Sequence, residues 1–257
     1  MTTWALDLDG VIWSGTEPIT GSSRAVADLR AAGRDVVFVT NNSFATIAQQ
    51  EQKLASFGID AHDAVITSAQ AAASLIEPGE RVLVLGGPGV IEALGVRDAE
   101  LIDHEMLGDF IPVATVSSVV VGLDWHLDYH RLSAAVQAIL AGARFIATNT
   151  DATYPSERGL LPGAGAIVAA VAAATGRSPV VAGKPEQPVA RLVRERFGDS
   201  GIMVGDRPET DGAFAAALGY DFGLVLSGVT TDPVGVVPTP DVVADDLARL
   251  VDAVLSG

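Results

Sequence analysis

Strand-length apolar runs alternate with segments of helical period along almost all of this 257-residue chain. Each apolar run is followed by turn residues and then by a segment that repeats with the period of a helix. This alternation is typical of α/β proteins in which the strands form a parallel sheet and the helices cover it. We therefore predict a doubly wound, Rossmann-like parallel sheet.

The same pattern predicts the individual elements. The predicted strands are residues 4–8, 35–40, 81–85, 116–121, 144–147, 180–182, 201–204 and 221–226. The predicted helices are residues 22–32, 43–57, 68–77, 131–140, 164–175, 188–197, 209–218 and 245–255. Breaks near Pro78 and Pro179 divide the chain, so that residues 79–179 form an α/β block inserted into one sheet domain made of 1–78 and 180–257.

The composition excludes several kinds of protein. With 49% hydrophobic residues, the chain can fill one large or two modest cores, which excludes wholesale disorder. The absence of cysteine excludes disulfides, thiolate zinc sites and a thiol nucleophile. The net charge of −16 repels polyanions, and Lys and Arg are scattered singly, so we expect no nucleic-acid partner.

Two stretches bear on location. No basic residue precedes Arg24, which is the wrong polarity for a signal peptide, so we expect a cytoplasmic protein. Residues 159–176 carry no charge and are nominally long enough to span a membrane. They contain Pro162 and Gly163 and are otherwise rich in alanine, so we predict a loop followed by a buried helix, and no membrane association.

Polar residues that directly follow buried strands are the first candidates for a site, because ligands of open parallel sheets bind beyond the carboxyl ends of the strands. The first strand ends in Asp7-Leu8-Asp9-Gly10. The period of two along a strand puts Asp7 and Asp9 on one side, and Gly10 lets the chain turn away. Two such close acids repel each other unless a cation or a shared proton relieves them, and Mg²⁺ is the simplest relief.

Three further strand ends carry unusual polar residues. Thr40 and Asn41 lead into a predicted helix N-terminus, which could hold an anion. Lys184, between Gly and Pro, is one of only two lysines in the chain, while Asp206 and Asp211 follow another strand. Together these residues supply carboxylates, one ammonium and hydrogen-bonding side chains. That set suits a phosphoryl group bound with Mg²⁺.

Four segments at these strand ends resemble, in order, the four motifs of the haloacid dehalogenase (HAD) superfamily. They are residues 7–11, 39–42, 183–185 and 205–206 with Asp211. Residues 122–124, 148–151 and 162–166 resemble the class IIA cap subfamily, which contains the NagD-like and 4-nitrophenylphosphatase-like phosphatases. The resemblance covers nearly the whole chain and implies a HAD core with the inserted block as an α/β cap.

The resemblance also implies a role for each motif residue. Asp7 would attack phosphorus and become an aspartyl-phosphate, and Asp9 would act as the general acid and then the general base. Thr40, Asn41 and Lys184 would bind phosphate oxygens. Mg²⁺ would be bound by Asp7, the carbonyl of Asp9 and Asp206, with Asp211 a ligand through water or a support.

The implied activity is that of a Mg²⁺-dependent phosphatase of small phosphate monoesters, with a small phosphorylated metabolite as its partner. The presence of Asp9 argues against haloacid dehalogenation, because the dehalogenases do not need a second acid in the first motif. Two alternatives stay open: a phosphotransferase or mutase, and a catalytically silent ligand-binding protein. Caps of this kind can pair subunits, so a homodimer through the cap is also an open expectation.

Plainer interpretations exist for each motif. Asp7 and Asp9 could cap a turn, residues 40–43 could only cap a helix, Lys184 could be a solvated surface lysine, and Asp211 could interact only with a helix dipole. An EF-hand is excluded, because Gly10 lies at the fourth loop position rather than the sixth. The glycines of residues 86–89 lack the spacing of a dinucleotide-binding loop.

Residues 124–130 contain two histidines and two aspartates and could be taken for a metal cluster. A junction between a loop and a helix is the commoner explanation. We expect that Asp124, Trp125 and His126 line the substrate face of the cap.

Overall fold

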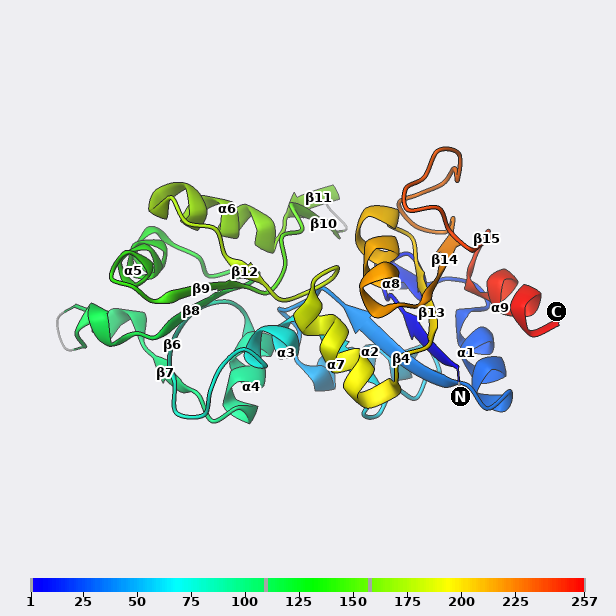
Figure 1. The fold of residues 1–257 in the computed structure, drawn as a ribbon, viewed down its shortest axis with the longest axis horizontal. Helices are drawn as coiled ribbons and strands as arrows, with labels where there is room; N and C mark the ends of the chain where they lie inside the picture. The colour runs from blue at the N-terminus through cyan, green and yellow to red at the C-terminus, as the bar shows by residue number, and fades with distance from the viewer. Residues whose placement is uncertain (1, 109–110, 157–158, 257) are drawn as a thin grey trace. The chain divides into compact units, whose positions relative to one another are not determined.

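The computed structural model describes residues 2–108, 111–156 and 159–256, and the chain folds into two compact units. The first unit contains Met1–Thr40, Ala48–Ile66 and Lys184–Gly257. The second unit contains Asn41–Ile47 and Thr67–Gly183. Figure 1 follows the chain through both units by colour.

The first unit is built on a six-stranded sheet with the order β15-β14-β13-β1-β4-β5. The strands are β1 (Thr3–Leu6), β4 (Asp35–Thr40), β5 (Val65–Thr67), β13 (Gly201–Gly205), β14 (Asp221–Val225) and β15 (Val242–Ala244). β1 pairs in parallel with both β4 and β13, and β13, β14 and β15 continue in parallel. The chain thus winds outward from β1 in both directions, which makes the carboxyl end of β1 the switch point where such sheets bind ligands.

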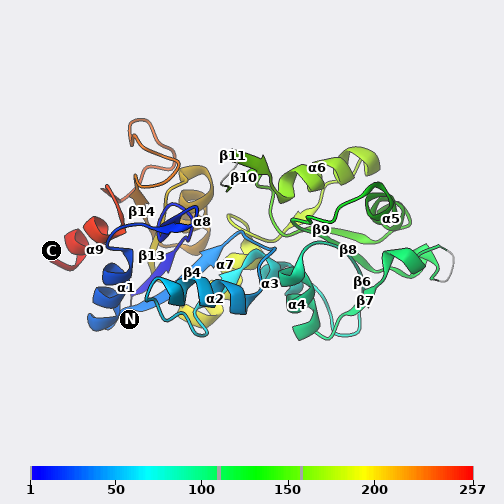
Figure 2. The same cartoon turned by 180° about the vertical axis from the view of Figure 1, so that it is seen from behind.

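Within the described residues, five α-helices accompany this sheet. They are α1 (Ser22–Ala31), α2 (Ile47–Ser56), α7 (Gln187–Phe197), α8 (Ala213–Leu218) and α9 (Leu247–Ser256). α1 lies beside α9, as Figures 1 and 2 show from opposite sides, and α7 packs against α8. Apolar side chains of the helices, such as Leu29 and Phe214, and of the sheet, such as Trp4 and Phe38, are almost fully buried. A short hairpin, β2 (Trp13–Ser14) and β3 (Glu17–Pro18), follows β1.

The second unit has its own parallel sheet of five strands in the order β12-β9-β8-β6-β7. The strands are β6 (Arg81–Leu85), β7 (Glu100–Ile102), β8 (Ser118–Val121), β9 (Arg144–Ala147) and β12 (Val180–Val181). The helices are α3 (Ser68–Ala73), α4 (Pro88–Val96), α5 (Tyr129–Leu140) and α6 (Ala164–Thr175), with 3₁₀ turns η1 (His104–Met106) and η2 (Val113–Thr115). α5 packs against α6, and both contribute to a core around Val119, Phe145 and Val168.

The uncharged stretch 159–176 becomes two elements. Its first residues form β11 (Gly159–Pro162), which pairs antiparallel with β10 (Thr153–Ser156), and the rest forms α6. Gly176 ends α6 in the left-handed conformation, with φ of 64°. Among the described residues, no helix has both the length and the apolar character needed to cross a membrane.

The structure confirms the predicted α/β class and finds a strand or helix at each predicted position. The strands β5, β7 and β15, the helix α4 and both hairpins were not predicted. Residues 41–47, 67–78 and 180–183, which were predicted to belong to the core, lie in the second unit. The division into a core of 1–78 and 180–257 and a cap of 79–179 stays a prediction.

Ser43 was expected to cap a helix that begins at once, and this prediction is wrong. α2 begins only at Ile47. The Ser43 hydroxyl is buried and accepts hydrogen bonds from the Thr148 hydroxyl (3.0 Å) and the Leu123 amide (3.4 Å). The Gly89 amide also donates to the Phe44 carbonyl (2.8 Å). These contacts within the second unit hold residues 43–44 out of the helix.

A polar network at the beginning of the second sheet connects Glu80, Ser118 and Arg144. The Glu80 carboxylate accepts hydrogen bonds from the Ser118 hydroxyl and from the Arg144 guanidinium (2.7 and 2.8 Å). Burial acts to raise the pKa of Glu80, but these hydrogen bonds outweigh it and leave the pKa below its ordinary value. Because folding lowers this pKa, the carboxylate stabilises the fold above about pH 4.3 and loses that effect as the pH falls through the folded value.

We therefore expect Glu80→Gln to lower the free energy of unfolding by about 1–3 kcal/mol at pH 7. Urea unfolding at pH 7 and below about pH 4 measures the effect, which should shrink at the lower pH. Glu100→Gln is the matched control, because Glu100 pairs with Arg81 at 3.3 Å while 58% of its side chain is exposed. A loss of stability for Glu80→Gln that does not change with pH would contradict the prediction.

Candidate active site

Two strand ends and one helical turn bring Asp7, Asp206 and Asp211 together in the first unit. Asp7 directly follows β1, and its amide donates to the Val204 carbonyl of β13 (2.9 Å). Asp206 directly follows β13, which is the parallel neighbour of β1. The carboxyl ends of neighbouring parallel strands meet at one edge, so the pairing of β1 with β13 accounts for the meeting of these acids.

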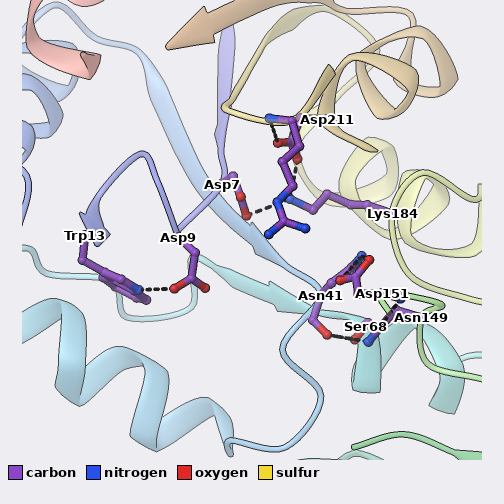
Figure 3. Close-up of polar contacts among 10 residues, drawn as sticks. Asp7, Asp9, Trp13, Asn41, Ser68, Asn149, Asp151, Lys184 and Asp211 are labelled. Atoms are coloured by element: carbon purple, nitrogen blue, oxygen red, sulfur yellow. Dashed lines mark hydrogen bonds and ion pairs between the residues drawn. The ribbon is translucent and has the colours of Figure 1, made fainter. Parts of the chain in front are cut away.

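Lys184 lies between two of the acids. Its ammonium donates to Asp7 Oδ1 (2.8 Å) and to Asp211 Oδ1 (2.7 Å), as the dashed lines in Figure 3 mark. The lysine is only 4% exposed. Burial acts to lower its pKa, but the charges of Asp211 and Asp7 outweigh burial and leave the pKa of Lys184 above its ordinary value. Lys184 is therefore a buried, charged group and not a solvated surface lysine.

The single ammonium of Lys184 does not compensate the negative charge of all three acids. Carboxylate oxygens of Asp7, Asp206 and Asp211 lie within 4.8 Å of one another. Burial and the neighbouring acids raise the pKa of Asp7 well above its ordinary value, although Lys184 acts to lower it. Burial also raises the pKa of Asp206, to about 6. The cluster therefore carries more buried negative charge than its own side chains compensate.

The backbone at two glycines approaches the Asp206 carboxylate closely on the side of Oδ2. A Cβ atom at Gly10 would lie 2.4 Å from Asp206 Oδ2, and one at Gly228 would lie 2.0 Å from the same atom. Gly10 also has a φ of +82°, which a residue with a side chain rarely adopts. Asp206 Oδ2 accepts from the Val229 amide (2.6 Å), whereas the buried Oδ1 has no hydrogen-bond partner within the described residues.

Asp211 reaches the cluster from a π-helical turn, η3 (Pro208–Gly212), which precedes α8. The predicted helix 209–218 is thus a π turn followed by an α-helix, and such π turns are frequent at functional sites. Asp211 Oδ1 accepts from Lys184, and Oδ2 accepts from the Arg207 amide (3.1 Å). Both oxygens of Asp211 are therefore engaged inside the protein.

This arrangement fits a hard divalent cation. Three converging carboxylates offer oxygen ligands of the kind Mg²⁺ prefers, and an unpartnered buried oxygen such as Asp206 Oδ1 costs free energy unless something binds it. Elsewhere in the described part of the chain, no group of three or more His, Asp or Glu side chains lies close enough to hold a metal.

Asp9 stands apart from the three-carboxylate cluster. Its side chain is half-buried, and Oδ1 accepts a hydrogen bond from the Trp13 indole Nε1 (2.8 Å). Figure 3 shows this pair beside the Asp7 loop. The side chain of Asp9 is thus not a member of the metal-ligand set, in keeping with the expectation that only its carbonyl would bind the metal.

The second unit fixes Asn41. The Asn41 side-chain amide donates to both oxygens of Asp151 (3.1 and 3.3 Å). Its carbonyl accepts from the Ser68 hydroxyl (2.8 Å) and from Asn149 Nδ2 (2.7 Å), as Figure 3 shows. The neighbouring Thr40, at the end of β4, is only 3% exposed. Asn41 is therefore held through both its side chain and its backbone.

Two family models match most of the chain. One, described as haloacid dehalogenase-like hydrolase, matches residues 4–99, and one described as HAD-hydrolase-like matches residues 181–250. The chain belongs to the haloacid dehalogenase (HAD) superfamily.

Relatives within the HAD superfamily align over nearly the whole chain. An acid sugar phosphatase of Staphylococcus saprophyticus is 38% identical over 235 residues, which are 89% of this chain and 87% of that protein. The structure of a p-nitrophenyl phosphatase from Archaeoglobus fulgidus has a TM-score of 0.89 at 32% identity and covers 98% of both chains. A glycerol phosphate phosphatase from Mycobacterium tuberculosis, solved with magnesium, has a TM-score of 0.87 at 34% identity, over 96% of this chain and 75% of that one. The predicted family and its NagD-like and 4-nitrophenylphosphatase-like subfamily are confirmed.

The three residues expected to line the substrate face of the cap in this HAD protein differ in their surroundings. Asp124 is buried, accepts from the His126 amide (2.8 Å), and pairs with Arg131 at 2.6 Å. Trp125 is 63% exposed and stacks on Phe44, with ring centroids 4.0 Å apart. His126 is exposed. Asp124 therefore holds this loop together, and the expectation that all three residues face the substrate stays a prediction.

Residues 124–130 form a junction between a loop and a helix, which confirms the explanation preferred in the sequence analysis. Asp128 caps α5 by accepting from the Arg131 amide (2.8 Å).

Three residues of this HAD chain that support the site were not predicted from the sequence: Trp13, Gly228 and Asp151. Asp151 lies in a segment that the resemblance singled out, but no role was assigned to it. Trp13 lies four residues after Asp9, so its spacing could have been noticed. Gly228 carries no sequence signal, because only its close approach to Asp206 marks it.

Proposed function

We propose that this HAD protein is a Mg²⁺-dependent phosphatase that hydrolyses small phosphate monoesters through an aspartyl-phosphate on Asp7. The observation that carries the proposal is the buried set of Asp7, Lys184, Asp206 and Asp211, with one ammonium shared by two acids and one carboxylate oxygen unpartnered. The relatives that carry phosphatase names support the same reaction class.

In the first step an oxygen of Asp7 attacks phosphorus, and the bond from phosphorus to the leaving oxygen breaks. Asp9 gives its proton to that oxygen, so that a neutral alcohol departs. In the second step Asp9 takes a proton from water while the water oxygen attacks phosphorus. The bond to Asp7 breaks, inorganic phosphate forms, and both aspartates return to their starting states.

Asp7, the Asp9 carbonyl and Asp206 would hold the magnesium ion. When bound, the ion offsets the repulsion between these acids and a phosphate dianion and stabilises charge on the phosphoryl oxygens. Asp211 is better suited to support than to direct ligation, because its two oxygens already accept from Lys184 and the Arg207 amide. Its role is to keep Lys184 charged and oriented.

Thr40, Asn41 and Lys184 would bind the phosphate oxygens. Lys184 brings a positive charge, while Thr40 and Asn41 bring hydrogen-bond donors at the end of a strand. Asp151 accepts from the Asn41 side-chain amide and fixes its orientation.

Small soluble esters of sugars or polyols are the proposed substrate class, because relatives are named for sugar phosphates and glycerol phosphate. The inserted block, residues 79–179, is the proposed cap that selects the leaving group, and pairing of two caps in a homodimer remains part of the proposal.

Turnover of 4-nitrophenyl phosphate with Mg²⁺ and with EDTA tests the proposal, followed by a panel of metabolite phosphates. Phosphate release that requires Mg²⁺ supports a phosphatase. Transfer of the phosphoryl group to a sugar instead of water would identify the phosphotransferase alternative, and no turnover of any ester would support the silent ligand-binding alternative.

We expect Asp9→Asn to lower kcat/KM for glycerol phosphate by about 10²- to 10⁴-fold, because an alcohol is a poor leaving group without a proton. The loss for 4-nitrophenyl phosphate should be much smaller, because nitrophenolate leaves readily without one. Initial rates with both substrates measure the difference. Equal losses for the two substrates would remove Asp9 from the role of general acid.

A further inference from the structure

The loop that carries Asp9 also carries the residue that orients it. We propose that Trp13 is a positioning residue for Asp9: its indole N–H occupies Asp9 Oδ1 and leaves Oδ2 as the oxygen that exchanges the proton with the leaving group and with water. This inference rests on the proposed function, since it assumes that Asp9 is the general acid and base.

A hydrogen bond joins the two side chains directly. Trp13 Nε1 lies 2.8 Å from Asp9 Oδ1, and the tryptophan is only 2% exposed, while Asp9 is half-buried. An indole nitrogen can only donate. A protonated carboxyl group that keeps this bond must therefore carry its proton on Oδ2. A carboxyl group without such a donor could carry the proton on either oxygen and rotate.

The backbone fixes the distance between the two residues. The Gly10 amide donates to the Trp13 carbonyl (2.7 Å), and the Ile12 and Trp13 amides donate to the Leu8 carbonyl (2.9 and 3.2 Å). The chain between Asp9 and Trp13 is thus a tight, internally bonded loop. The indole ring also packs against Phe57, with ring centroids 5.9 Å apart. Neither partner of the hydrogen bond can move far without breaking these contacts.

Lys53, the chain's only lysine besides Lys184, strengthens the arrangement. Its ammonium lies 3.8 Å from the centroid of the Trp13 ring and donates to the Gly15 carbonyl (3.2 Å). A cation over an aromatic face draws electron density from the ring, which makes the indole N–H a stronger donor.

The decisive experiment compares the loss of kcat/KM for a substrate with an alcohol leaving group with the loss for a substrate that releases nitrophenolate. We expect Trp13→Phe, which keeps the aromatic ring and removes the donor, to lower kcat/KM for glycerol phosphate by about 10- to 100-fold. The loss for 4-nitrophenyl phosphate should stay below about threefold, because that leaving group needs little help from Asp9. Lys53→Met should change the ratio of the two rates in the same direction by a smaller factor.

Phe57→Leu is the matched control, because Phe57 packs on the same ring and has no donor. It should lower both rates by the same factor, if at all. Thermal unfolding and calorimetric Mg²⁺ affinity should be the same in Trp13→Phe and the wild type, within the change seen in Phe57→Leu. An equal loss for both substrates in Trp13→Phe would reduce Trp13 to a core residue and overturn the inference.

A spectroscopic measurement tests the inference without altering Trp13. The chain has three tryptophans, so it gives three indole N–H signals in a ¹H–¹⁵N NMR spectrum, and Trp13→Phe assigns one of them. That signal should shift in Asp9→Asn, because the group that accepts the indole hydrogen bond has changed. An unchanged signal would contradict the bond on which the inference depends.

Failure of the inference can be distinguished from failure of the proposed function. If Asp9→Asn lowers kcat/KM much more for glycerol phosphate than for 4-nitrophenyl phosphate, and Trp13→Phe does not, then Asp9 is the acid and Trp13 does not position it. If Asp9→Asn lowers kcat/KM equally for the two substrates, Asp9 is not the general acid. The inference about Trp13 is then wrong as well.

Discussion

Asp7→Asn is expected to abolish phosphate release, by at least about 10⁴-fold in kcat, because an amide cannot form the acyl-phosphate bond. The variant should be as stable as the wild type or more stable. Folding raises the pKa of Asp7, chiefly through burial, so its ionised form disfavours the folded state at neutral pH. An uncharged amide of the same shape removes that cost and leaves Lys184 paired with Asp211.

Steady-state kinetics and thermal unfolding at pH 7 together test this expectation. Asp28→Asn is the matched control in the same unit, because Asp28 lies on the surface of α1 and faces Arg24 at 3.8 Å. The control should keep both its activity and its melting temperature. Turnover by Asp7→Asn within tenfold of the wild type would refute the covalent role of Asp7.

Lys184→Met is expected to have the largest effect on stability. Removing one partner of a buried ion pair costs about 3–5 kcal/mol, and here the lost ammonium serves two acids at once. The pKa of Lys184 is raised by folding, so its stabilising effect is fully present at neutral pH and would be lost only as the pH rises through the folded value. Phosphatase activity should disappear with it.

Magnesium should partly restore the stability of Lys184→Met. A cation that binds the folded protein alone adds stability in proportion to the logarithm of its concentration, and the variant has more uncompensated negative charge to bind it. Urea unfolding in EDTA and in millimolar Mg²⁺ measures this difference. The matched control is Lys53→Met, which should lose far less stability and gain no more from Mg²⁺ than the wild type. Equal gains in Lys184→Met and the wild type would argue against a metal beside Lys184.

The acids and the lysine could be predicted from the sequence because the ends of parallel strands meet at one edge of the sheet. Asp7 and Asp206 follow buried runs, and the pairing of β1 with β13 is what a doubly wound sheet requires. By contrast, β5, β7 and β15 have only three residues each, too few to give a periodic signal. The helix α4 begins at Pro88, and the glycines around this residue are typical of a loop.

Contacts between distant parts of the chain account for what sequence analysis missed at the site. Asp151 is 110 residues from Asn41, and nothing in either local sequence shows that they meet. Ser43 was expected to cap a helix on local grounds, but contacts with Thr148 and Leu123 draw it elsewhere. Local propensity is a weak guide where tertiary hydrogen bonds compete for the same side chain.

The bridging ammonium has a consequence for how this protein opens. Lys184 joins residues that are 177 and 27 positions away in the chain, so the segments around Asp7, Lys184 and Asp211 cannot separate one at a time without stranding a buried charge. Their backbone amides should exchange with deuterium at a common rate, as one cooperative foldon rather than as three independent loops.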